Sequence, residues 1–95
     1  MATYVLAQLE VHDRDALRRY VKAAAPTVAE HGGTGLFVDD APEVLEGTWD
    51  GPRTIALRFE TREAAERWYR SAGYQAAIAL RRACARTNLV FVEGV

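Results

Sequence analysis

The sequence predicts a single α+β domain over residues 1–95, built as an antiparallel sheet with helices on one of its faces. Three observations predict this fold class. Several runs alternate apolar and polar residues, which indicates strands covered on one side only. Segments with apolar residues at helical spacing separate those runs. A length of 95 residues fits one domain.

The strands are expected from alternation and from β-branched and aromatic residues. In the first strand, Tyr4–Val11, the apolar Val5, Ala7 and Leu9 share one face. Four further strands are expected over Thr34–Val38, Val44–Trp49, Thr54–Glu60 and Leu89–Glu93. The second and third strands are close enough in sequence to form a hairpin.

The helices are expected from capping residues and from apolar stripes. Asp13 begins a helix that ends at the glycine pair 32–33, with Pro26 expected to kink or break it. Thr61 caps the next helix, and a last helix covers residues 74–85. With the hairpin counted as one unit, the order is the β-α-β-β-α-β layout of the ferredoxin-like fold.

The face of the sheet away from the helices has a mixed character. Alternation places Leu6, Gln8, Phe37 and Arg58 there, together with Glu46. This face is too apolar for water and too polar for an ordinary core. Two such sheets packed face to face would close a barrel with a partly polar interior, so we expect a homodimer that forms a dimeric α+β barrel.

Composition and charge exclude several classes of protein. The net charge is −1 and the isoelectric point is about 6.1, with no Lys/Arg-rich run, which argues against nucleic-acid binding. The arginine pairs at 18–19 and 81–82 fit solvated helix surface. No apolar run is long enough to span a membrane, and no leader is recognisable, so a cytoplasmic protein is expected. Cys84 is the only cysteine, which excludes an intrachain disulfide.

A set of residues in order along nearly the whole chain resembles the DUF1330 family. The residues that carry the resemblance are Tyr4-Val5-Leu6-Ala7, Asp13 with Tyr20, Gly32-Gly33, Leu45-Glu46-Gly47 with Trp49, Phe59, Trp68-Tyr69 and Tyr74-Gln75. The resemblance implies a dimeric α+β barrel of ferredoxin-like subunits. It also implies a superfamily that includes heme-degrading and cofactor-free monooxygenases, muconolactone isomerases and polyketide cyclases. The chain has Thr34 and Gly73 where members of the family often have an arginine and an acidic residue.

Four residues are candidates for catalysis. Glu46 lies in an apolar run, and a carboxylate in such surroundings suits a general acid or base. Asp39 and His31 could assist it, and Arg58 could hold an anionic oxygen through its planar guanidinium. The structural alternatives are a salt bridge for Glu46 and Arg58, a turn for Asp39 and a helix C-terminus for His31.

Six more residues are candidates for substrate binding, with packing as the alternative for the aromatic ones. They are Gln8, Tyr20, Phe37, Trp49, Trp68 and Tyr69. The two histidines, His12 and His31, have no close cysteine or histidine partner, so no metal site and no cofactor are expected.

The expected function is a cofactor-independent enzyme that performs acid/base chemistry on a small, carbonyl-bearing, partly apolar substrate. Hydrolysis, isomerisation and cyclisation all fit this description. Two alternatives stay open: a non-catalytic binder of small molecules, and a monooxygenase of the same barrel class, with or without heme.

Overall fold

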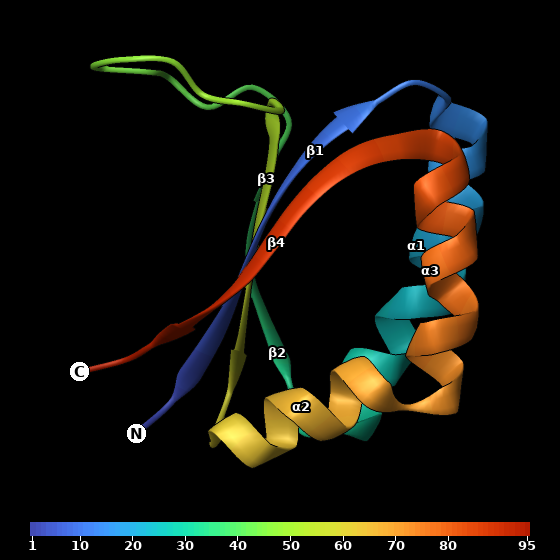
Figure 1. The fold of residues 1–95 in the computed structure, drawn as a ribbon, viewed down its shortest axis with the longest axis vertical. Helices are drawn as coiled ribbons and strands as arrows, with labels where there is room; N and C mark the ends of the chain where they lie inside the picture. Colours follow the sequence, from blue (N-terminus) through green and yellow to red (C-terminus); the bar gives the residue numbers. More distant parts are fainter.

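The computed structural model describes all residues 1–95 as a four-stranded antiparallel sheet with three helices on one face (Figure 1). Its elements are β1 (Thr3–Val11), α1 (Arg14–Glu30), β2 (Thr34–Asp39), β3 (Arg53–Phe59), α2 (Arg62–Arg70), α3 (Ala72–Cys84) and β4 (Ala85–Glu93). The strands lie in the order β2-β3-β1-β4. This arrangement confirms the predicted α+β, ferredoxin-like fold, with the second crossover divided between α2 and α3.

The two faces of the sheet follow the alternation of the central strand. Val5 of β1 lies opposite Leu57 of β3 and Phe91 of β4, and this row faces the helices. The neighbouring row, which includes Tyr4 and Arg58, faces away from them. The prediction of one covered and one open face is therefore confirmed.

Side-chain caps start the helices at the predicted places. Asp13 accepts a hydrogen bond from the backbone N–H of Ala16 at 3.0 Å, and Thr61 accepts one from Ala64 at 3.1 Å. Ser71 caps α3 in the same way, so this helix begins at residue 72 and not at 74. These caps satisfy N–H groups that a helix leaves unpaired in its first turn.

One expected interruption, at Pro26, is absent. α1 continues through Pro26 to Glu30, and the burial of Ala24 and Thr27 on either side of the proline holds this turn in place. Gly73 lies in the first turn of α3, next to the break at Ser71 that separates α2 from α3. Tertiary packing outweighs the local signal of the proline.

The core lies between the sheet and the helices. Its aromatic centre is Trp68 of α2, whose ring lies 5.4 Å from Phe59 and 4.2 Å from Tyr74 between centroids. The Trp68 indole N–H donates to Thr27 Oγ1 at 3.1 Å, which satisfies this buried polar group. Gly33 lies so close to Phe59 that a Cβ atom there would be 2.6 Å from the ring. The glycine at the end of α1 is therefore required by packing.

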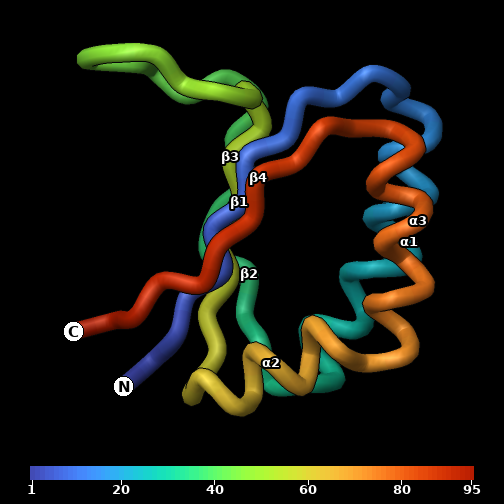
Figure 2. Tube along the Cα trace, viewed as in Figure 1, coloured from blue at the N-terminus to red at the C-terminus, as the bar shows by residue number.

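The predicted strand over Val44–Trp49 is wrong. Residues 40–52 form a loop between β2 and β3 that pairs with no strand and projects from the open side of the sheet (Figures 1 and 2). Gly47 and Gly51 have φ of +76° and +86°, a backbone conformation that interrupts a strand. Glu46 is therefore exposed on a loop and lies in no apolar strand.

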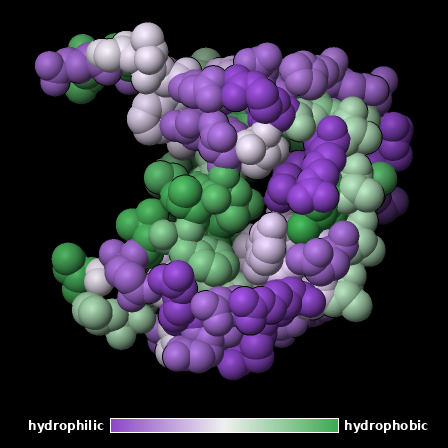
Figure 3. Space-filling model, in the orientation of Figure 1, coloured by the Kyte–Doolittle hydropathy of each residue, from purple (hydrophilic) through white to green (hydrophobic).

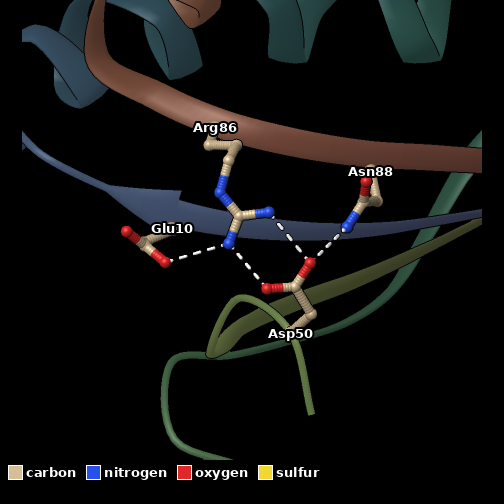
Figure 4. A network of polar contacts seen from close by, with 4 residues as sticks. All are labelled: Glu10, Asp50, Arg86 and Asn88. Atoms are coloured by element: carbon tan, nitrogen blue, oxygen red, sulfur yellow. Dashed lines mark hydrogen bonds and ion pairs between the residues drawn. The ribbon is translucent and has the colours of Figure 1, made fainter.

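An ion-pair network anchors the second half of this loop to the sheet (Figure 4). Arg86 of β4 donates to both oxygens of Asp50, at 2.6 and 2.9 Å, and to Glu10 of β1 at 3.0 Å. Asn88 donates to Asp50 at 3.0 Å. A two-pronged Arg–carboxylate contact fixes geometry well, so the loop leaves the sheet in a defined direction.

This network predicts an unusual titration of Asp50. Its hydrogen bonds from Arg86 and Asn88 lower the pKa of the carboxyl from 3.8 to about 2. The anchoring is therefore fully present above pH 3.8 and is lost as the pH falls through 2. Carboxyl NMR titration should give a midpoint near 2 for Asp50, and Arg86→Gln should return it toward about 4. A midpoint near 4 in the unmodified protein would contradict the network.

The open face of the sheet carries exposed apolar side chains. Phe37 of β2 is 51% exposed, and Val90 and Val92 of β4 are 50% and 42% exposed. Figure 3 shows hydrophobic residues gathered on this side, between the projecting loop and the chain termini. None of the helices is long and apolar enough to cross a bilayer.

Candidate functional site

A cavity of about 140 Å³ lies between the helix-covered face of the sheet and the helices. Fourteen of its 17 lining residues are hydrophobic. β1 contributes Val5, Ala7 and Leu9, because alternate residues of a strand point to the same side. Concave, mainly apolar spaces with a few polar groups are where small molecules bind most often.

Three polar side chains form a chain of hydrogen bonds in the wall of this cavity. Arg81 Nη1 donates to the Tyr74 hydroxyl at 2.7 Å, and the Tyr74 and Tyr20 hydroxyls lie 2.9 Å apart. Tyr74 and Arg81 stand seven residues apart on α3, which places them on one face of that helix. Tyr20 reaches them from α1. When Tyr74 directs its proton to Tyr20, the Tyr20 O–H is free to donate into the cavity.

Burial sets the charge state of this group. It raises the pKa of Tyr20 well above its ordinary value, and the nearby Tyr74 raises it further, so Tyr20 keeps its proton at neutral pH. Burial works against the charge on Arg81, but the two tyrosine oxygens outweigh it, and the pKa of Arg81 is raised. The site therefore combines a fixed cation with neutral hydroxyl donors.

The same cavity gathers the unpaired polar atoms of the protein. Buried side-chain nitrogen or oxygen atoms without a hydrogen-bond partner occur in three residues: Arg53, Arg81 and Thr87. All three residues line this cavity. Arg53 and Thr87 flank Leu9 on the neighbouring strands, so the register of the sheet brings them to the same row. A buried unpaired donor is costly, which makes these groups candidates for binding a ligand.

The donors suit an oxygen atom that carries negative charge. Two guanidinium groups and the tyrosine hydroxyls can stabilise an enolate, phenolate or carboxylate in surroundings of low dielectric constant. No aspartate, glutamate or histidine lines the cavity. No group of three or more His, Cys, Asp or Glu side chains is arranged to hold a metal ion.

Two of the predicted site residues line the cavity, namely Tyr20 and Trp68. Tyr69 lies next to it in the core, with its ring 5.7 Å from that of Tyr74. Gln8, Phe37 and Arg58 lie on the open face, and Arg58 pairs with Glu60 at 3.0 Å. The structure thus divides the predicted set between the two sides of the sheet.

The other predicted residues lie in or near turns. Trp49, on the projecting loop with Glu46, donates to Thr54 Oγ1 at 2.9 Å. Asp39 accepts from the backbone N–H of Ala41 at 2.9 Å, as a turn aspartate does. His31 Nδ1 lies 2.7 Å from the Thr27 carbonyl at the end of α1. These contacts match the structural alternatives that the sequence allowed for Asp39 and His31.

Arg81 is the main residue that the sequence analysis missed. The expectation of a solvated arginine pair at 81–82 is wrong for Arg81, which is only 6% exposed. Its spacing of three and four residues from the buried Ile78 and Ala77 places it on the apolar stripe of α3, and that signal was available. The partners of Arg81, and its position beside Arg53 and Thr87 in the cavity wall, depend on the tertiary fold.

Solved structures with this fold come from several bacteria. A protein of unknown function from Rhodopseudomonas palustris is 15% identical, with a TM-score of 0.83 over 99% of this chain and 82% of its own. A dimeric ferredoxin-like protein of unknown function from Jannaschia sp. CCS1 is 19% identical, with a TM-score of 0.77 over 99% and 100%. SnoaB, a cofactor-independent oxygenase from Streptomyces nogalater, is 11% identical, with a TM-score of 0.67 over 99% and 93%.

The sequence itself places the chain in a family. A comparison with curated proteins finds no match. Residues 2–95 match the family described as a domain of unknown function, DUF1330, which confirms the resemblance seen in the sequence. The chain therefore belongs to the DUF1330 family.

Proposed function

We propose that this protein is a cofactor-independent enzyme that acts on a small, carbonyl-bearing, partly apolar substrate in the cavity beneath α1 and α3. The observation that carries the proposal is the convergence of polar groups on one apolar cavity. The residues with unpaired buried polar atoms all line it, beside the Tyr20–Tyr74–Arg81 chain. Such an arrangement is more costly than an apolar lining unless a ligand uses it.

The chemistry that fits these groups is stabilisation of an oxyanion. A substrate carbonyl that accepts from Tyr20 would become more acidic at its α-carbon, and the resulting enolate would stay close to the Arg81 cation. Isomerisation and cyclisation both proceed through such an enolate. Because no carboxylate or imidazole lines the cavity, the proposal favours substrates acidic enough to lose the proton to water.

A second candidate function is oxygenation of a phenol or enol without a cofactor. The structural similarity to SnoaB favours it, and the same donors would hold the reactive phenolate. Isomerisation and cyclisation proceed without oxygen, whereas oxygenation consumes it. Oxygen dependence therefore separates the two candidates.

We also propose that two copies pair through their open sheet faces. The exposed Phe37, Val90 and Val92 would then be buried, and Gln8 and Arg58 would line the interior of the resulting barrel. The dimeric Jannaschia protein supports this proposal. Glu46, Asp39, His31 and Arg58 lie outside the cavity. Arg58 lies on the open face, so a catalytic role for it would place the substrate at this interface. A cytoplasmic location stays a prediction.

The proposal is tested by turnover in protein dialysed against a chelator. A panel of β-keto acids, unsaturated γ-lactones and phenols, with and without oxygen, would be followed by liquid chromatography coupled to mass spectrometry, because isomerisation leaves the mass of the substrate unchanged. At least one compound should be consumed, and Tyr20→Phe should lower kcat by about 100-fold, the usual effect of losing one oxyanion donor.

Tyr4→Phe is the matched control, because Tyr4 lies on the face of β1 away from the cavity. This variant should keep the activity of the unmodified protein. Saturable binding without any product would identify a non-catalytic binder. If Tyr20→Phe has the same kcat as the unmodified protein, the Tyr20–Tyr74–Arg81 chain does not stabilise an oxyanion.

A further inference from the structure

A basic cleft adjoins the apolar cavity, between α1 and the start of β3. It has a volume of about 420 Å³ and is lined by six residues, of which four are basic. These four are Arg14, Arg18, Lys22 and Arg53. No acidic side chain lines the cleft, although the whole chain carries a net charge of −1. The positive charge is therefore a local feature of this surface.

The ion pairs near the cleft leave a positive excess. Arg18 pairs with Asp15, and Arg53 pairs with Asp40 at 2.7 Å. Arg14 and Lys22 take part in no ion pair. Charges of one sign around a concave surface raise the local concentration of ligands of the opposite sign.

Arg53 connects the cleft to the cavity. It lines both, as does Val21 of α1. Its side chain is 15% exposed, and its Nε is buried with no partner. One Nη of Arg53 already donates a hydrogen bond to Asp40. The donors of Arg53 that remain suit a head group with a single negative charge. A carboxylate has that charge and matches the planar guanidinium.

The size of the cavity limits the apolar part of the ligand that is attached to the head group. An engineered protein cavity of about 150 Å³ with apolar walls is known to bind benzene. The cavity here, at about 140 Å³, has room for one ring of that size. Its walls include the ring of Trp68, which would lie against such a group.

We propose that the ligand of this site is a monocyclic aromatic carboxylate, which enters through the basic cleft, places its ring in the cavity and leaves its carboxylate at Arg53. The inference rests on the proposed function and supplies its substrate class. Chemically, the ligand is an amphipathic monoanion whose one ring carries the carbonyl or phenol oxygen that the proposed function requires. The Tyr20–Tyr74–Arg81 chain then faces the part of the molecule that lies within the cavity.

Fluorescence of Trp68 gives a direct test with defined probes. In a Trp49→Phe background Trp68 is the only tryptophan, and it lines the cavity. Phenylacetate should quench it saturably and bind at least tenfold more tightly than the neutral phenylacetamide at low salt. The difference should shrink at high ionic strength, because the cleft is open to solvent. Diphenylacetate, with two rings, should bind at least tenfold more weakly than phenylacetate.

Variants of Arg53 test whether the cleft causes the preference for the charged ligand. Arg53→Gln should abolish the preference for the acid over the amide, and Arg53→Lys should keep part of it. Arg67→Gln is the matched control, because Arg67 is an exposed arginine of α2 outside both the cleft and the cavity. This control should preserve the full preference.

Several results would overturn the inference. They are equal affinity for phenylacetate and phenylacetamide, equal losses in Arg53→Gln and Arg67→Gln, tight binding of diphenylacetate, or no binding of phenylacetate by fluorescence and calorimetry. A different result would contradict the proposed function alone. In that case phenylacetate would bind with the expected charge preference, but no compound of the turnover panel would be consumed. The two failures are therefore distinguishable.

Discussion

Replacing Phe59 with alanine is expected to lower the free energy of unfolding by about 3–5 kcal/mol. Phe59 is fully buried at the end of β3, where its ring packs against Trp68 and closely against Gly33. The loss of the ring would leave a void at the junction of the sheet, α1 and α2. A domain of this length has about 5–14 kcal/mol of stability in total, so the change removes a large share of it.

Urea denaturation followed by circular dichroism measures this loss. Leu45→Ala serves as the control, because Leu45 is 84% exposed on the loop between β2 and β3 and should change stability by less than about 0.5 kcal/mol. Both variants should be compared at the same protein concentration, since dimerisation adds to apparent stability. A loss below about 1 kcal/mol for Phe59→Ala would contradict the packing at this junction.

Val92→Asp is expected to weaken the proposed homodimer by at least about 1000-fold. Val92 is 42% exposed on the open face, opposite Tyr4 of β1, and would be buried in the dimer. A twofold interface contains two copies of the substitution, and each unpaired buried carboxylate costs several kcal/mol in practice. A total above about 4 kcal/mol corresponds to three powers of ten in the dissociation constant.

Analytical ultracentrifugation across a range of concentrations measures this change. Leu80→Asp is the matched control, because it introduces the same charge at an exposed apolar position of α3, on the other side of the molecule. This variant should remain dimeric, and circular dichroism should show that both variants are folded. A monomeric unmodified protein, or a dimeric Val92→Asp variant at micromolar concentration, would refute pairing through the open face.

The sequence by itself determined the helices, the four strands of the sheet and their faces, but not the loop at 40–52. Alternation in Tyr4–Val11 identified the covered row of β1, and Asp13 and Thr61 marked the starts of α1 and α2. These features depend on backbone dihedral angles and on neighbours within four residues, which the local sequence specifies. The family resemblance, carried by residues such as Trp68 and Tyr74, was confirmed over residues 2–95.

Only the tertiary structure decided which residues meet. Val44–Trp49 has the composition of a strand, but a strand forms only when it pairs with another strand, and this segment pairs with none and forms a loop. Arg81 stands in a basic pair typical of solvated surface, yet the packing of α3 against α1 buries it beside Tyr20. The candidate site differs from the one that the sequence predicted for the same reason, because a cavity is formed by residues far apart in the chain. Their meeting depends on strand order, register and helix packing, which no local pattern specifies.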